Sequence, residues 1–175
     1  QITFDMSDDL MLYGGVNRGV KAGSYNAPLL GAFYGAGGPG SLPYDEEVLT
    51  SYEGGFKATL GDGLTRINGS VFYYDYADYQ AFLFVGVGGV VINRDSDNYV
   101  AELEIQSSPV PGLALMFNAA YFDATVKDVS LRKVSPLPPS DVAPTYATEF
   151  QVARLIRFAF DVLVVDIAVH ADALY

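Results

Sequence analysis

The chain contains one histidine, His170, and acid–base catalysis near neutral pH would centre on it. Asp166 and Asp172 lie four and two residues away, so in a strand all three side chains would share one face, and a carboxylate could orient the imidazole. A triad also needs a nucleophile, and one row of a strand cannot by itself assemble that geometry. The plainer interpretation of His170 is a polar side chain facing a wet interior. We therefore expect no enzyme activity.

Three short motifs are poor candidates for binding sites. The carboxylates of "RDSDN" at 94–98 lack the glycine and the distal glutamate of a calcium loop, so we expect a solvated external loop there. The glycines of "GAGGPG" at 35–40 do not follow an apolar strand, and Pro39 opposes the helix start that a dinucleotide site needs. "NGS" at 68–70 lies inside a predicted strand and is a chance match to a glycosylation acceptor. We expect no metal and no cofactor.

Composition narrows the class of protein further. The formal net charge of −11 repels phosphate backbones, which argues against nucleic acid as a partner. The chain has no cysteine and hence no disulfide or thiolate site. The aromatic residues are 13 tyrosines and 11 phenylalanines, with no tryptophan. Tyrosine favours places with one dry and one wet side. The first ten residues do not have the pattern of a signal peptide.

Apolar residues recur with a period of two, which predicts strands rather than helices. In "SYEGGFKATL" the row that contains Tyr52 and Phe56 is apolar or small, and the row that contains Glu53 and Lys57 is polar or small. The same division recurs in the stretches at 66–73, 99–106 and 115–121. At 155–175 the "VLVV" segment is apolar on both sides, so a buried helix is an alternative there, although its β-branched residues favour a strand.

The predicted connections alternate in length along the chain. Short ones at 7–9, 61–63, 108–112 and near 157–161 alternate with longer ones at about 22–47, 84–96 and 127–144. An up-and-down antiparallel sheet with this alternation carries its tight turns at one rim and its long loops at the other. Outer-membrane barrels have this asymmetry, with strands that are apolar outside and polar inside. A soluble antiparallel sandwich or barrel is the alternative. Tyrosines beside the long-loop rim and charged residues in mid-strand favour a transmembrane β-barrel of about seven or eight strands.

Ligand contacts of such a barrel would come from its external loops. Side chains able to stack on or hydrogen-bond a ligand occur in the first long loop. They are Tyr25, Asn26, Phe33 and Tyr34. Arg18 and Lys21, near its base, could meet an anionic ferric chelate, or they could be ordinary strand-end cations paired with acidic neighbours.

Three segments taken in order resemble a known family. They are "LMLYGGVNRGVKAGSYN", "YDEEVLTSYEGGFKATLGDGLTRINGSVFYYDYADYQAF" and "NYVAELEIQSSPVPGLALMFNAAYFDATVKD". Together they are similar to consecutive strands in the later part of the barrel of TonB-dependent outer-membrane receptors, over residues 9 to 150. The most specific pieces are the tyrosine followed by "NRGVKAG", the "LTSYEGGFK" strand with its "DG" turn, and "ELE" ahead of "PGLAL".

The resemblance implies a barrel of about 22 strands, closed by an amino-terminal plug domain. Such receptors lie in the outer membrane of Gram-negative bacteria and take up siderophores, haem, cobalamin or carbohydrates with energy passed through the plug from the TonB system. Residues 1–175 contain no plug and no TonB-box segment, so we expect a partial barrel domain cut from a longer receptor. The alternatives are a self-contained eight-stranded barrel with a structural or adhesive role, and an outer-membrane hydrolase, which the lone histidine disfavours.

Overall fold

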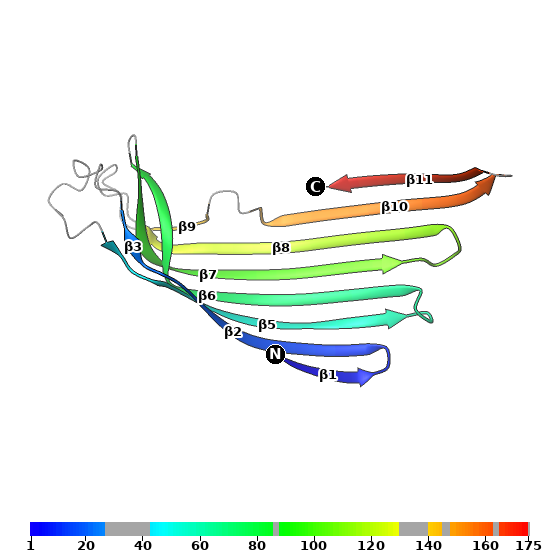
Figure 1. Cartoon of the computed structure of the whole chain (residues 1–175), viewed down its shortest axis with the longest axis horizontal. Helices are drawn as coiled ribbons and strands as arrows, with labels where there is room; N and C mark the ends of the chain where they lie inside the picture. The colour runs from blue at the N-terminus through cyan, green and yellow to red at the C-terminus, as the bar shows by residue number, and fades with distance from the viewer. Residues whose placement is uncertain (27–42, 86–87, 130–139, 145–147, 163–164, 175) are drawn as a thin grey trace.

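The computed structural model describes residues 1–26, 43–85, 88–129, 140–144, 148–162 and 165–174; for 84, 85, 88, 160–162 and 165–174 it describes the backbone alone. Eight strands form the continuous path of one nine-stranded antiparallel sheet, and each of the eight pairs with the next of them along the chain (Figure 1). They are β1 (Ile2–Ser7), β2 (Leu10–Lys21), β5 (Glu47–Leu60), β6 (Thr65–Val85), β7 (Gly88–Ser107), β8 (Leu113–Val129), β10 (Phe150–Val162) and β11 (Val165–Leu174). The predicted up-and-down order is confirmed.

Three short strands lie in the connections. β3 (Ser24–Tyr25) pairs with β4 (Pro43–Tyr44) inside the link between β2 and β5. β9 (Ser140–Val142) pairs with the end of β8. The part of the chain that the structure describes contains no helix able to cross a membrane.

The two rims of the sheet differ as predicted. Tight turns join β1 to β2, β5 to β6 and β7 to β8 at one end, and the links from β2 to β5 and from β8 to β10 lie at the other (Figure 1). In the β5–β6 turn, Gly61, Asp62 and Gly63 all have positive φ angles of 62°, 54° and 92°, and Leu64 N–H donates to the Gly61 carbonyl at 3.1 Å. Glycine at two of these three positions removes most of the steric cost of that backbone path.

Two predicted connections are wrong. The intermediate loop at 84–96 is instead the upper part of a hairpin, in which β6 and β7 stay paired from Tyr79 with Arg94 up to Val85 with Gly88. The "RDSDN" segment is therefore strand, because backbone pairing continues beyond the wall regardless of side-chain polarity. The break predicted near 157–161 is also wrong, since β10 runs through it and pairs with β11 as far as Val162 with Val165. The helical alternative for the last stretch is excluded by the same pairing.

Pairing register divides the sheet into two faces with different chemistry. Tyr52 lies opposite Tyr73, and Tyr73 lies opposite Tyr99, so side chains an even number of residues from these three share a face. This outer face is mainly apolar, whereas the inner face carries Glu53 and Glu102. The two rows predicted for residues 51–60, 66–73, 99–106 and 115–121 are thereby confirmed.

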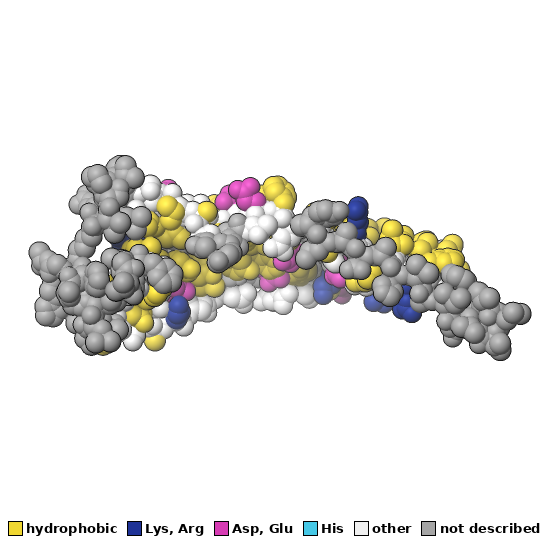
Figure 2. Space-filling model, turned by 90° about the horizontal axis from the view of Figure 1, so that it is seen from above, with side chains coloured by type: hydrophobic (Ala, Val, Ile, Leu, Met, Phe, Trp, Pro, Cys, Tyr) yellow, Lys and Arg dark blue, Asp and Glu magenta, His cyan; other side chains and the backbone are white. Residues whose placement is uncertain are grey.

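The sheet is a single curved layer with little interior of its own. Seen from above it is long and narrow, with hydrophobic side chains along its middle (Figure 2). Large apolar side chains of the outer face remain open to solvent, with Val71 60% and Ile156 52% exposed. The buried hydrophobic cluster among the described residues is small and consists of Ala81, Val126 and Val129. The sheet is open, with β1 and β11 at its two edges. An open layer of this kind satisfies its backbone groups in a membrane only as part of a closed barrel.

Candidate functional site

An apolar band occupies the outer face between the tight-turn rim and the tyrosines. On β6 it runs from Thr65 to Tyr73, which is the nine residues that suffice for a strand to cross the hydrocarbon layer at a tilt. Its members on neighbouring strands are Leu12, Phe56, Ile67, Val71, Leu103, Ile105, Phe117 and Val152. This face is suited to contact with lipid chains.

A row of tyrosines closes the band on the side of the long loops. Tyr73 stacks between Tyr52 and Tyr99, with ring centroids 6.0 and 4.9 Å away. Further along the sheet, Tyr121 and Phe150 form a tilted pair at 4.9 Å. Such a row matches the aromatic girdle at the headgroup level of an outer-membrane barrel.

The hydroxyl of Tyr73 ties the girdle to the polar row above it. It donates to Asp97 Oδ1 at 3.0 Å, and Asp97 also forms an ion pair with Lys127. We expect Tyr73→Phe to lower the free energy of unfolding by about 1–2 kcal/mol, because a carboxylate loses a hydrogen bond in a partly buried site. Urea unfolding of the barrel in lipid vesicles measures this loss.

Tyr99→Phe provides the matched control for that experiment. Tyr99 stacks on the same ring, but its hydroxyl makes no hydrogen bond within the described part of the chain, and the residue is 52% exposed. Its replacement should cost about 0.5 kcal/mol or less. Equal losses in the two variants would show that the bond to Asp97 contributes nothing.

Arg18 lies on the outer face, one register step above the girdle. It pairs in register with Thr50, and the same row continues through Asp75 and Asp97. The side chain is exposed. Arg18 therefore lies just beyond the tyrosine row, on the opposite face from Lys21.

Polar pairs line the inner face at the height of the apolar band. Asn68 donates to Glu104 Oε2 at 2.9 Å, and Gln106 donates to Glu104 Oε1 at 2.7 Å. A hollow of about 290 Å³ opens beside them, lined in part by Glu102, Asn118 and Gln151. Charged and amide groups at this depth require water or a polar partner, so the inner face suits a wet lumen.

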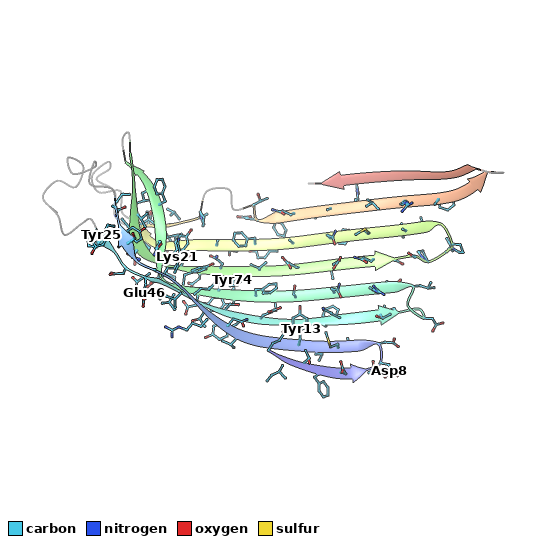
Figure 3. All side chains as sticks on the ribbon, in the orientation of Figure 1. Asp8, Tyr13, Lys21, Tyr25, Glu46 and Tyr74 are labelled. Carbon is cyan, nitrogen blue, oxygen red and sulfur yellow. The ribbon has the colours of Figure 1, made fainter. Side chains whose placement is uncertain are left out.

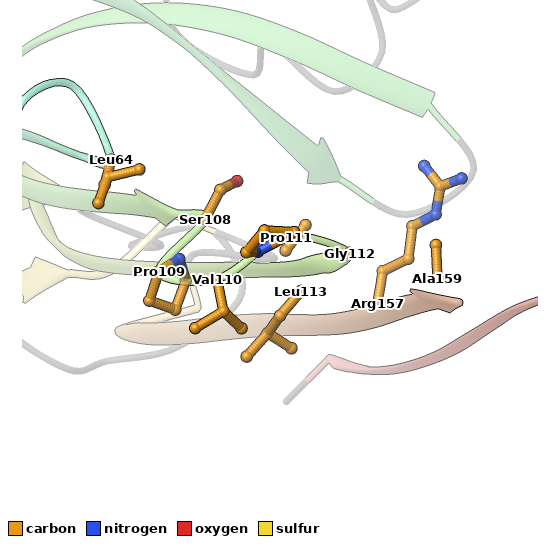
Figure 4. A pocket seen from close by; sticks show the side chains of 10 residues that line it. Leu64, Ser108, Pro109, Val110, Pro111, Gly112, Leu113, Arg157 and Ala159 are labelled. Atoms are coloured by element: carbon orange, nitrogen blue, oxygen red, sulfur yellow. The ribbon is translucent and has the colours of Figure 1, made fainter. Parts of the chain in front are cut away.

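A second hollow lies at the tight-turn rim, far from the long loops. It has a volume of about 620 Å³ and lies between the 108–112 turn and the ends of β8 and β10 (Figure 4). Pro109, Pro111 and Arg157 contribute to its lining. None of the predicted ligand contacts that fall within the described residues lies there.

At the loop rim, the β6–β7 hairpin extends beyond the wall after a β-bulge. Tyr76 pairs with Ser96 and Tyr79 pairs with Arg94, so Ala77 and Asp78 oppose one residue, and Asp78 has a positive φ of 58°. One face of the extension covers Val126 and Val129 at the end of β8. Arg94 Nε also donates to the Asp128 carbonyl at 2.9 Å.

The other face of the hairpin is hydrogen-bonded to both ends of the β2–β5 connection. Gln80 Nε2 donates to the carbonyls of Ala22 at 2.9 Å and Asp45 at 3.1 Å, and Gln80 N–H donates to Glu47 Oε2 at 2.8 Å. Asn93, opposite Gln80 in register, accepts from Asp45 N–H at 2.8 Å and donates to the Asp45 carbonyl at 3.1 Å. Sequence reasoning missed these residues, because no local pattern connects positions so far apart.

Four of the six predicted ligand contacts can be placed. Lys21 and Tyr25 lie at the loop rim (Figure 3), where Lys21 is 3.9 Å from Glu47 and Tyr25 is 76% exposed. Asn26 is buried, and its amide donates to the Val91 carbonyl at 2.9 Å and accepts from Val91 N–H at 2.7 Å. Phe33 and Tyr34 lie outside the described residues. Lys21, Tyr25 and Asn26 are thus brought to one rim, and Arg18 lies on the opposite face of β2 from Lys21.

The family follows from a comparison with known proteins. The family model "TonB dependent receptor-like, beta-barrel" matches residues 1–155. The chain belongs to this family. TonB-dependent receptors are transporters rather than enzymes, and their barrels are outer-membrane proteins of Gram-negative bacteria, as the resemblance implied. Their barrel accounts for the two faces and for the girdle between them.

A solved TonB-dependent receptor has the same fold over almost the whole chain. It is the ferric yersiniabactin uptake receptor FyuA from Yersinia pestis, with a TM-score of 0.67 and 18% sequence identity. The match covers 95% of this chain and 23% of that one, so the chain spans about a quarter of the length of that receptor. No group of three or more histidine, cysteine, aspartate or glutamate side chains in the described ranges is placed to hold a metal ion.

Proposed function

We propose that this chain is part of the barrel wall of an energy-coupled outer-membrane receptor that takes up siderophores or similar scarce nutrients. The observation that carries the proposal is the register of the sheet, which aligns an apolar band, a tyrosine girdle and a polar inner face across successive strands of a TonB-dependent receptor barrel. The similarity in fold to a receptor for a ferric chelate supports the class of cargo.

Uptake needs parts of the receptor other than this segment. We propose that residues 1–175 are one part of the barrel domain, and that a plug domain elsewhere in the receptor connects it to the TonB system. Lipid of the outer membrane contacts the outer face. A ferric siderophore or another small ligand approaches from the long-loop rim, and the cell is a Gram-negative bacterium.

Lys21 and Tyr25 are the ligand contacts that the described structure supports best. Both lie at the loop rim, and neither is buried. Phe33 and Tyr34 remain predicted contacts in the same connection. Arg18 and Asn26 also remain predictions, although the position of Arg18 on the outer face and the two bonds of Asn26 to Val91 give each of them another role.

Uptake by whole cells tests the proposal. Cells that lack the complete receptor gene should lose energy-dependent uptake of one class among iron-55 complexes of catecholate, hydroxamate, phenolate and carboxylate chelators. The complete gene on a plasmid should restore uptake, and the same plasmid in cells without TonB should not. Unchanged uptake of all four classes, together with unchanged uptake of cobalamin, haem and oligosaccharides, would overturn the assignment.

The structure gives no support to a self-contained eight-stranded barrel. Closure would require β1 to pair with β11, and within the described residues these strands lie at opposite edges of an open sheet (Figure 1). Their backbone groups would face lipid unpaired in an isolated eight-stranded form.

A further inference from the structure

Four polar side chains join two external segments that are far apart in the sequence. They are Asn26, Glu47, Gln80 and Asn93, which we call the polar latch. Asn26 and Glu47 are 7% and 9% exposed, so both are held in a largely dry junction. Their partners lie on the β6–β7 hairpin, 65 residues from Asn26 and 33 from Glu47.

Asn26 completes the backbone pairing of a strand edge. β8 pairs with β7 only as far as Ser96, so the part of β7 above that residue has no ladder partner on that side among the described residues. An unpaired strand edge leaves N–H and C=O groups exposed. The Asn26 amide satisfies both groups of Val91, one as donor and one as acceptor, in the manner of a neighbouring strand.

The two ends of the β2–β5 connection are also bound to each other. Ser24 pairs with Tyr44 and Tyr25 pairs with Pro43. A Cβ at Gly23 would lie 2.6 Å from the Tyr44 carbonyl oxygen, so the two chain segments approach closely there. The two ends of the connection are thus already paired with each other. Hydrogen bonds from the hairpin attach both ends to it, through Ala22, Asn26, Asp45 and Glu47.

We propose that the polar latch makes the described ends of the β2–β5 connection and the β6–β7 hairpin a single rigid body, in which Asn26, Gln80 and Asn93 are positioning residues. The apolar cluster of Ala81, Val126 and Val129 holds the opposite face of the hairpin on β8, so this body is anchored to the barrel wall. It presents Tyr25 and Lys21 in fixed places. The assignment of this body to ligand recognition rests on the proposed function, but the mechanical coupling does not.

Amide hydrogen exchange of the complete receptor in lipid nanodiscs, without ligand, tests the coupling. The informative amides are Val91, which donates to Asn26, and Asp45, which donates to Asn93. We expect Asn26→Ala to accelerate exchange at Val91 about tenfold. Exchange at Asp45 should also accelerate several-fold, although its own acceptor is untouched. Asn93→Ala should produce the reciprocal change at Val91.

Matched variants separate coupling from general destabilisation. Asn17→Ala, at an exposed asparagine of β2, should leave both amides unchanged, and the Leu103 amide in the wall should exchange at the wild-type rate in every variant. Asn26→Asp keeps an acceptor for Val91 N–H and loses the donor, so its acceleration should be intermediate. Acceleration at Val91 alone in Asn26→Ala, or at neither amide, would overturn the proposal. Neither result depends on uptake, so the proposed function is tested separately.

Discussion

Replacing Val71 by Arg is expected to lower the free energy of unfolding of the barrel by about 2–3 kcal/mol. Val71 lies on the outer face, one register step below the tyrosine girdle, and it is 60% exposed in this segment. The cost arises because the arginine would lie among lipid chains, and no acidic side chain lies near Val71 on that face to pair with it. Urea unfolding of the receptor in lipid vesicles measures the loss.

Ser70→Arg is the control, since it adds the same charge one residue away on the opposite face. Ser70 pairs in register with Glu102, so an arginine there would gain a partner in a wet lumen. We expect a change below about 0.5 kcal/mol. A larger loss for Ser70→Arg than for Val71→Arg would mean that the two faces have been assigned the wrong way round.

The faces of the strands could be predicted from the sequence because alternation needs no knowledge of neighbours. Tyr52 and Glu53 point to opposite sides of any strand, and their different solvation fixes which side meets lipid. The same reasoning applied to β6, β7 and β8, where the pairing register confirmed it. The alternation is more informative in a membrane strand, because a shift of one residue would move every charged side chain of the strand into hydrocarbon.

The β6–β7 extension, which lies beyond the lipid-facing part of the sheet, could not be predicted from alternation. No lipid contacts this extension, so neither of its faces needs to be apolar, and a paired hairpin there can have the same polar composition as a loop. "RDSDN" has the composition of a loop, yet Asp97 and Asn98 lie within the β7 ladder. The bulge at Ala77 and Asp78 also reverses the alternation at the point where the ribbon begins.

The part of the site that depends on contacts between residues far apart in the sequence could not be predicted from the sequence either. Asn26 was predicted as a ligand contact, because an asparagine in a polar loop is free to bind in the absence of other information. The structure uses both functional groups of its amide on Val91. Arg18 was predicted at the base of the same loop, but which face it occupies depends on its parity with Tyr52, and that became visible only with the register.

The second large effect is expected at a glycine of the tight-turn rim. Gly112 has a φ of 83°, and a Cβ there would lie 2.1 Å from the Ala159 carbonyl oxygen on β10. Gly112→Ala should therefore lower the free energy of unfolding by about 3 kcal/mol, with about 1 kcal/mol from the left-handed backbone and the remainder from forcing β10 away. The hydrogen bond from Ala159 N–H to the Gly112 carbonyl, 2.7 Å long, lies at the same contact and should weaken with it.

Gly63→Ala isolates the backbone contribution. Gly63 also has a positive φ, of 92°, but a Cβ there would meet nothing within 4 Å. Its replacement should cost only about 1 kcal/mol in the same urea unfolding experiment. The difference of about 2 kcal/mol between the two variants then measures the contact of the β7–β8 turn with β10. Equal losses would mean that the turn does not pack against β10 in the membrane, and that the close approach of Gly112 to Ala159 is not a feature of the folded barrel.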